Sequence, residues 1–336
     1  MPDFENFIRI INRESTDKRA LFELFLNKTL YEKLAGRPMP DEGKSVTLEK
    51  LKFLIDAFKN AGYDYATTFA CNYQFEHDNH LVKQTISLNI GAVISDRRSF
   101  ENYPWKDIVE SEFSCLDEIS DYLPDNMKLN IMSPGGVLEN VIQLAGFDAL
   151  CFMMYEDEQL FADLFDAVGK RLLEYYEIAA RYDSVGILTV NDDWGFKTQT
   201  FFSVETMRKY VFPWHKKIVE AIHKQGKPAL LHSCGNLAAV MDDIIDDMRF
   251  DAKHSFEDSI ITIEDAYSLW GDRICLLGGI DVNFLISKPV EEIKKRCKAI
   301  LSATCEKGGY MLGSGNSIPD YIPQEKYFAM ISCIQE

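Results

Sequence analysis

The chain lacks the segments by which several large protein classes are identified. It contains no GxGxxG and no GxxxxGK[ST] pattern, which argues against a dinucleotide-binding turn and against a P-loop. No apolar run approaches the roughly 18 residues that cross a bilayer. The opening segment, MPDFENFIRIINREST, holds no apolar signal-peptide core. We therefore expect a soluble, cytoplasmic protein that does not bind membranes.

Positive charge and paired cysteines are also scarce. The 336 residues include 53 acidic and 36 basic side chains, a net charge of −17, so the phosphates of a nucleic acid would be repelled. We expect no nucleic-acid partner. The eight cysteines form no CxxC pair, and several lie in apolar segments such as ALCFMM and RICLLGG. This distribution is typical of buried free thiols in a reducing compartment.

The chain does contain a regular alternation of short apolar runs and long amphipathic stretches. Strands that are each followed by a helix predict a parallel sheet, and seven or more such units favour a (β/α)8 TIM barrel over an open sheet. We therefore predict an α/β fold of this type in a single domain over residues 1–336. The predicted strands are 65–69, 128–133, 185–190, 228–233, 252–256, 274–280 and 310–314. The predicted helices include 158–181, 204–225, 237–247 and 290–306.

Two regions do not follow this repeat. Residues 1–60 are predicted to form an N-terminal helical cap on the barrel. Within 72–120, the segment LVKQTISLNIGAVISD alternates apolar and polar residues, so we predict an inserted hairpin over the active face.

The most informative stretch is LLHSCGNL, residues 230–237, which places His232 and Cys234 two positions apart after an apolar run. In an extended segment, side chains at i and i+2 point the same way. An imidazole and a thiol aimed together at a strand end make half of a zinc site. The same two residue types also serve nucleophile–base chemistry, so the pair alone does not settle the reaction.

Polar residues also follow the other predicted strands, where the chemistry of an α/β barrel is located. We expect a third zinc ligand among Asp192, Asp193, Glu257 and Asn316, and the sequence does not choose between them. The catalytic candidates are Asp193, Glu257 and Asn316. These residues and Asp192 each have a structural alternative: Asp192 and Asp193 as helix caps or turn residues, Glu257 at a helix N-terminus, and Asn316 as a turn residue.

Substrate-binding candidates are less specific. They are Asp192, Trp194, Tyr155 and Asp281. Trp194 and Tyr155 suit either the core or a wall for a flat substrate, and Asp281 suits a tight turn after two glycines. A metal-free site would instead use Asp193 and His232 as acid and base.

Long blocks of the chain resemble the uroporphyrinogen decarboxylase superfamily, and more narrowly its cobamide-dependent methyltransferase branch. The similarity extends over nearly the whole chain. The blocks that carry it are INRESTDKRALFELF (11–25), PGGVLENVIQLAGFDALCFMMYED, VNDDWGFKTQTFFSVETMRKYVFPWHKKIVEAIHKQGKPALLHSCGNL, HSFEDSI, LLGGIDV and GSGNSIPDYIPQEKYFAM.

The resemblance implies a zinc ion held by a His-x-Cys pair and a later Cys. The pair corresponds to His232 and Cys234, whereas the later Cys corresponds to Asn316. This departure favours members of bacterial O-demethylase systems over those that alkylate a thiol. Such enzymes move a methyl group from a methoxylated, often aromatic, small molecule to the cobalt of a separate corrinoid protein. Asp193 or Glu257 would then complete the zinc shell.

The absence of a DxHxxG signature implies that the corrinoid (cobalamin) arrives on a partner protein. A metal-free decarboxylase or lyase, a methylcobamide:thiol methyltransferase and a binding protein without activity are the alternatives. The decarboxylase itself carries an N-terminal RQAGR segment that clamps substrate carboxylates. Here the N-terminal basic residues Arg13, Lys18 and Arg19 are spaced differently.

Overall fold

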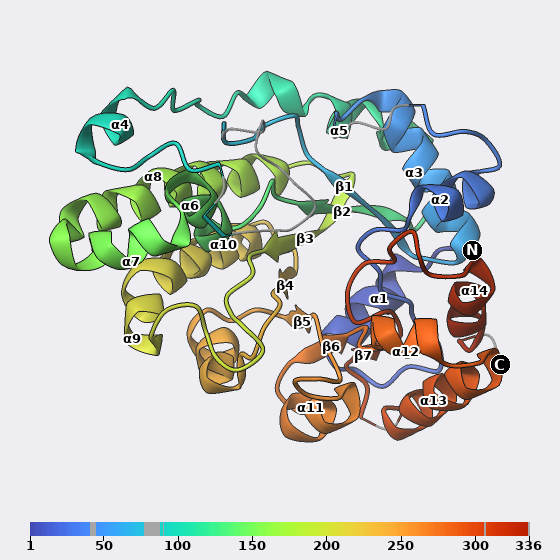
Figure 1. Ribbon diagram of the computed structural model, residues 1–336. Helices are drawn as coiled ribbons and strands as arrows, with labels where there is room; N and C mark the ends of the chain where they lie inside the picture. Colours follow the sequence, from blue (N-terminus) through green and yellow to red (C-terminus); the bar gives the residue numbers. More distant parts are fainter. Residues whose placement is uncertain (41–44, 77–87, 90, 306, 335–336) are drawn as a thin grey trace.

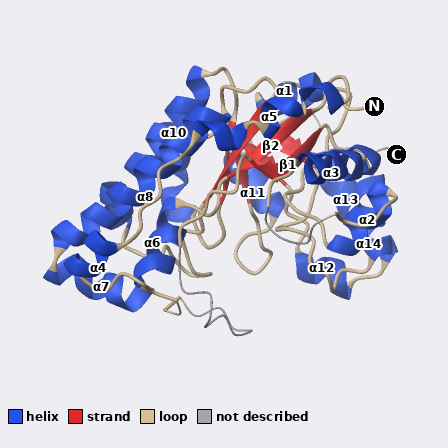
Figure 2. Ribbon diagram, turned by 90° about the horizontal axis from the view of Figure 1, so that it is seen from above, coloured by secondary structure: helices blue, strands red, loops and turns tan. Residues whose placement is uncertain are grey.

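Seven parallel strands form one curved sheet in chain order, with helices packed around it (Figures 1 and 2). The computed structural model describes residues 1–40, 45–76, 88–89, 91–305 and 307–334. All seven predicted strands are present. They are β1 (Tyr65–Phe69), β2 (Lys128–Met132), β3 (Val185–Asn191), β4 (Ala229–His232), β5 (Ala252–His254), β6 (Cys275–Leu277) and β7 (Tyr310–Met311).

The strands are buried along nearly their whole length, because helices cover the outside of the sheet and side chains fill its inside. Parallel strands need such crossover helices. The helices are α1 (Phe4–Ile11), α2 (Lys28–Ala35), α3 (Leu48–Ala61), α4 (Arg97–Asn102), α5 (Cys115–Glu118), α6 (Val137–Ala145), α7 (Phe147–Glu156), α8 (Glu158–Ala179), α9 (Val204–Thr206), α10 (Phe212–Lys224), α11 (Ile263–Trp270), α12 (Val282–Ser287), α13 (Val290–Ala303) and α14 (Gln324–Ser332).

The helix predicted over 204–225 is continuous but not uniform. Ser203 caps it, because its side chain accepts a hydrogen bond from the Thr206 amide at 3.2 Å. A π-helical segment, Met207–Val211, joins α9 to α10. The predicted helical character is therefore confirmed, and α10 carries two histidines that contact opposite ends of the sheet.

The N-terminal helices do not form a single cap. α1 lies at the N-terminal ends of β2 and β3, where the Phe4 amide donates to the Asn126 carbonyl at 3.0 Å. The segment after α1 runs beside β7: the Phe22 amide donates to the Leu312 carbonyl at 2.8 Å, and Leu21 and Leu312 form a parallel bridge. α2 and α3 pack together, and α3 also packs against β1. This region thus contributes to the sheet as well as to its cover.

The predicted hairpin falls largely on residues 77–87 and 90, which lie outside the described residues. The described part of 72–120 contains α4, α5 and two short 3-10 turns, and no strand.

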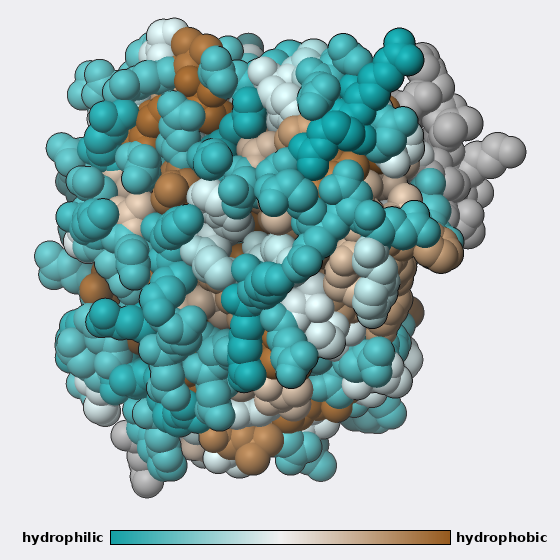
Figure 3. Space-filling model, turned by 90° about the vertical axis from the view of Figure 1, so that its left-hand side faces the viewer, coloured by the Kyte–Doolittle hydropathy of each residue, from teal (hydrophilic) through white to brown (hydrophobic). Residues whose placement is uncertain are grey.

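One face of the molecule is mainly hydrophilic, with separate hydrophobic groups between polar ones (Figure 3). This agrees with the excess of acidic residues. Among the described helices, none is by itself long and apolar enough to cross a membrane; α6 and α7 reach that length and composition only as a pair bent by 92°.

Candidate metal centre

The C-terminal ends of β3 and β4 bring together Asp193, His232 and Cys234, whose ligand atoms all lie within 4.8 Å of one another. His232 is the last residue of β4 and lies opposite Asn191 in β3 and His254 in β5. Asp193 follows β3 by two residues. Because β3 and β4 are parallel neighbours, their C-terminal ends lie side by side. Asp193 therefore lies close to His232 and Cys234, although it is about forty positions away from them in the chain.

The distances suit one shared ion. His232 Nε2 and Cys234 Sγ are 4.0 Å apart, close to the about 3.6 Å expected between a nitrogen and a sulfur on a tetrahedral zinc ion. Asp193 Oδ1 accepts a hydrogen bond from the Cys234 amide at 2.7 Å, which fixes its carboxylate beside the thiol. The three side chains offer nitrogen, sulfur and oxygen, the donor types that zinc prefers.

Burial sets the charge of the two central groups. It lowers the pKa of His232 to about 4, so the imidazole is neutral and can donate a lone pair to a metal. Burial and the adjacent Asp193 carboxylate raise the pKa of Cys234 to about 12. The thiol is thus protonated unless a cation stabilises the thiolate. Metal binding should therefore release a proton from Cys234.

Asn316 lies next to this cluster as a hydrogen-bond donor. Its side-chain nitrogen is 3.5 Å from Cys234 Sγ, and its Oδ1 accepts from the Ser317 amide at 2.8 Å. The backbone N–H of Ser317 can donate only to an oxygen, so Oδ1 of Asn316 must be the atom that faces Ser317. The side-chain N–H of Asn316, and not its oxygen, faces the sulfur.

Two glycines permit this close arrangement. A Cβ on Gly235 would overlap the backbone of Gly195, and Gly235 also adopts a φ of +98°. A Cβ on Gly136 would overlap Asp192 and the Asn191 carbonyl. Larger residues at these positions would push apart the loops that follow β2, β3 and β4.

Asp192 and Trp194 lie in the interior. Asp192 is fully buried and accepts hydrogen bonds from the Leu138 and Glu139 amides, each at 2.9 Å, and from His215 Nε2 at 2.8 Å. Trp194 is also fully buried, with its ring centroid 4.9 Å from that of His215. These positions match the capping alternative for Asp192 and the core alternative for Trp194. Asp192 therefore joins the start of α6, and through His215 also α10, to the end of β3.

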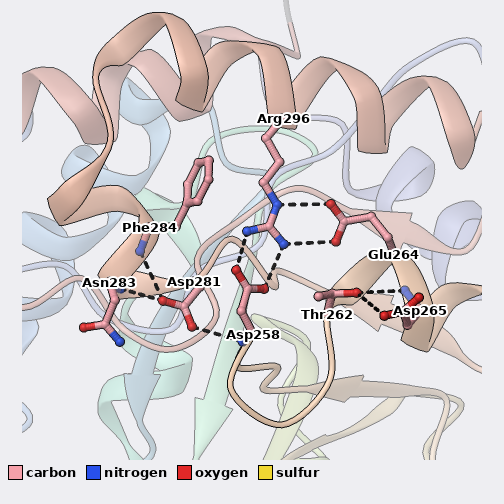
Figure 4. Close-up of polar contacts among 8 residues, drawn as sticks. All are labelled: Asp258, Thr262, Glu264, Asp265, Asp281, Asn283, Phe284 and Arg296. Atoms are coloured by element: carbon pink, nitrogen blue, oxygen red, sulfur yellow. Dashed lines mark hydrogen bonds and ion pairs between the residues drawn. The ribbon is translucent and has the colours of Figure 1, made fainter.

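Three other candidates lie apart from the cluster of Asp193, His232 and Cys234. Asp281 caps α12 through the Asn283 and Phe284 amides and accepts from the Asp258 amide at 3.0 Å (Figure 4). Glu257 is partly exposed, 3.8 Å from Lys197. Tyr155 is 84% exposed near the end of α7. Of the four residues proposed as a third ligand, Asp193 and Asn316 are therefore the two beside the His-x-Cys pair.

A cavity of about 490 Å³ opens beside the cluster, at the ends of β1, β2 and β3. Glu139 and Asn191 lie in its wall next to Asp193, and they hydrogen-bond to each other at 2.6 Å. Burial raises the pKa of Glu139 to about 8, with further contributions from the Asp193 and Asp192 charges. The lining residues are Ser45, Phe69, Cys71, Asn72, Tyr73, Gln74, Phe75, Pro134, Gly135, Glu139, Asn140, Gln143 and Asn191.

Three further ionisable residues near this end of the sheet were not predicted from the sequence: Glu139, Lys253 and His254. Glu139 lies three residues after Gly136 and accepts from its amide at 3.0 Å, so it reads as an ordinary helix-start residue. Lys253 is buried in β5 and donates to the Ser255 carbonyl at 2.6 Å; burial lowers its pKa to about 8. His254 is fully buried. The segment AKHSF places Lys253 and His254 in an otherwise apolar strand, and this pattern could have identified them as candidates from the sequence.

The family model described as uroporphyrinogen decarboxylase (URO-D) matches residues 124–336. The chain is 24% identical over 188 residues to the uroporphyrinogen decarboxylase of Citrifermentans bemidjiense, covering 56% of this chain and 52% of that protein. It is 24% identical over 182 residues to that of Geobacter sulfurreducens, covering 54% and 51%. The chain thus spans about half the length of the curated relatives it matches.

The structure is similar to that of a methyltransferase from Methanosarcina mazei, with a TM-score of 0.71 at 16% sequence identity, over 100% of this chain and 99% of that one. At this identity the similarity concerns the fold. The predicted parallel α/β, TIM-barrel-like architecture is confirmed, whereas the sheet of the described residues has seven strands and not the eight of the predicted (β/α)8 barrel. The family model, in turn, covers more than half of the chain. The chain therefore belongs to the uroporphyrinogen decarboxylase family.

Proposed function

We propose that this protein is a zinc-dependent methyltransferase that moves a methyl group between a methoxylated, aromatic small molecule and the cobalt of a separate corrinoid protein. The observation that carries the proposal is the convergence of Asp193, His232 and Cys234 at the strand ends. The fold shared with a methyltransferase from Methanosarcina mazei supports it.

The donor set fits zinc in a catalytic site. Three protein ligands leave the fourth tetrahedral position open, as catalytic zinc sites require. His232, Cys234 and Asp193 would hold the ion. Zinc held by these residues would polarise an ether oxygen and make the phenolate a better leaving group.

The residues of the chain provide the surroundings. The Asn316 amide faces the Cys234 sulfur, and such a hydrogen bond draws electron density from a thiolate. The Asp193 carboxylate and one thiolate would together neutralise a divalent zinc ion. A site of this kind suits an oxygen ligand better than a site with two thiolates does, and this favours the ether over the thiol alternative.

The cavity beside the cluster suits an aromatic substrate. Its volume falls within the range of about 300–1,000 Å³ typical of small-molecule sites. Phe69, Tyr73 and Phe75 supply apolar rings, and amide side chains supply neutral hydrogen-bonding groups. The lack of a DxHxxG signature supports a corrinoid that is carried by a partner protein.

Decarboxylation of a polycarboxylate is the second candidate, because the matched relatives bear that name. The contacts of the N-terminal basic residues argue against decarboxylation, because these side chains are bound elsewhere in the described structure. Lys18 pairs with Asp3, Arg13 donates to the Arg273 carbonyl, and Arg19 donates to the Leu301 carbonyl. All three lie away from the cluster at the strand ends.

The first experiment is the metal content of the wild type and of Cys234→Ala, both purified without chelator or His-tag and measured by plasma mass spectrometry. We expect near-stoichiometric zinc in the wild type and its loss in the variant. His223→Ala, which changes a histidine at the opposite end of the sheet, is the matched control and should keep the zinc.

Activity is then measured with methoxylated aromatics and cob(I)alamin as methyl acceptor. Methyl transfer by the wild type that Cys234→Ala abolishes would support the proposal. A wild type that stays metal-free after zinc is offered would refute the zinc mechanism. Release of CO2 from a carboxylated substrate without any cobamide would establish the decarboxylase instead.

A further inference from the structure

A second buried histidine, His254, contacts the ring nitrogen of His232 that does not face Cys234. His232 Nδ1 and His254 Nδ1 are 2.8 Å apart, and the two side chains come from adjacent strands, β4 and β5. His254 is fully buried and His232 is 6% exposed. At this distance one ring nitrogen must carry the hydrogen and the other must accept it.

The other nitrogen of His254 decides the direction. His254 Nε2 is 3.1 Å from the Ser314 carbonyl oxygen, which can only accept a hydrogen bond. The hydrogen of His254 is therefore on Nε2. A neutral imidazole carries a single N–H, so His254 Nδ1 has a lone pair and must accept from His232. His254 is fully buried, and burial away from water favours the neutral ring.

Glu23 holds the Ser314 carbonyl in place. The Ser314 amide donates to Glu23 Oε2 at 3.2 Å, and Ser314 Oγ is 2.8 Å from Glu23 Oε1. Ser314 Oγ also contacts the Asn316 carbonyl, and its single hydrogen cannot serve both oxygens. Both contacts are satisfied when Glu23 is protonated and donates to Ser314, in agreement with a pKa that burial raises to about 8.

We propose that His254 is a positioning residue that holds His232 in the tautomer with its hydrogen on Nδ1, so that the lone pair of Nε2 faces Cys234. The proposal rests on the metal centre proposed above, but it concerns a property of the protein without metal. It extends the centre by a chain of contacts from His232 through His254 and Ser314 to Glu23. In this arrangement the ligand nitrogen is selected before any ion binds, and metal binding does not require a change of tautomer.

The test is a long-range ¹H–¹⁵N correlation spectrum of metal-stripped protein labelled on histidine, with the His232 signals assigned by their loss in His232→Ala. We expect a hydrogen on Nδ1 and a bare Nε2 for His232, and a hydrogen on Nε2 for His254. His232 with its hydrogen on Nε2 would overturn the proposal.

The variants add a functional readout. In His254→Phe, whose ring cannot accept, we expect a mixture of His232 tautomers and a zinc affinity lower by about 10–100-fold. His254→Gln, whose amide oxygen can accept, should retain more of the affinity. His223→Phe is the matched control and should change neither the tautomer nor the affinity. Unchanged zinc affinity in His254→Phe would contradict the positioning role, and if that variant does not fold, the wild-type spectrum and His254→Gln decide.

The two proposals fail in different ways. The expected tautomer in a protein that never binds zinc would leave the positioning role intact and refute the zinc mechanism. Stoichiometric zinc on a protein whose His232 carries its hydrogen on Nε2 would refute the positioning role alone.

Discussion

Two His–Asp pairs with the same nitrogen–oxygen distance of 2.8 Å lie at opposite ends of the sheet. Both histidines belong to α10. His215 contacts Asp192 at the C-terminal end of β3, and both side chains are fully buried. His223 contacts Asp251 next to the start of β5, and each side chain is about 30% exposed. The same chemical pair thus occurs once in the interior and once at the surface.

The difference shows that the structure at the C-terminal end of the sheet, where the candidate metal centre lies, depends on buried polar groups. Asp192 also accepts from the first amides of α6, so it fixes the helix that carries Glu139. Asp251 accepts from the Ala229 amide at 2.8 Å, but water can replace its other contacts. A buried charged group that loses its partner is left uncompensated, whereas an exposed one is rehydrated. We therefore expect unequal effects from identical substitutions.

The largest expected effect comes from Asp192→Ala. Removing this carboxylate leaves two helix amides and His215 without their acceptor in the interior, and we expect the free energy of unfolding to fall by about 3–5 kcal/mol. Asp251→Ala, the matched change, should lower it by about 1 kcal/mol. Urea unfolding followed by circular dichroism measures both. Equal losses would show that burial does not distinguish the two pairs.

Glu23→Gln extends the comparison to a buried acid without a histidine partner. Burial raises the pKa of folded Glu23 to about 8 from an ordinary value of 4.5, so the folded state keeps a proton that the unfolded state loses between these values. The stability that Glu23 contributes is therefore fully present below pH 4.5 and is lost as the pH rises to 8.

Glutamine keeps the hydrogen bonds to Ser314 without titrating. We expect the free energy of unfolding of Glu23→Gln, relative to the wild type, to rise by about 1.4 kcal/mol per pH unit across this window. Unfolding curves at a series of pH values measure the difference. Parallel profiles for the two proteins would mean that Glu23 is ionised in the folded state.

The smallest expected effect comes from Asn316→Ala. Asn316 is partly exposed and lies beside Cys234 at the C-terminal end of the sheet. Its contact with Cys234 Sγ is a single weak hydrogen bond, so we expect the free energy of unfolding to change by less than about 1 kcal/mol. In the cobalt(II)-substituted protein, the sulfur-to-metal charge-transfer band should shift, because the thiolate becomes a stronger donor. An unchanged band would show that the amide does not act on the sulfur.

The positions of the seven strands were predictable because each is a short apolar run between turn residues. The length of β6 and β7 was not: both are shorter than predicted. Positive φ angles at Gly278 and Gly279 end β6, and beyond the two strands Ile280 pairs with Ser314, and Leu312 with Leu21, as isolated bridges. The N-terminal region was the least predictable part. Its extended segment at Ala20–Phe22 contacts Leu312, and nothing local in the sequence indicates a partner so distant along the chain.

The sequence determined by itself the parallel α/β architecture, the family blocks and the His-x-Cys pair, because these depend on periodicity and on spacing within one segment. Only the tertiary structure chose Asp193 over Glu257 as the carboxylate beside that pair, turned Asn316 toward the sulfur and placed His254 behind His232. These three outcomes join residues from different strands and loops. The register of parallel strands and the burial of side chains set such contacts, and neither is encoded in any single segment of the chain.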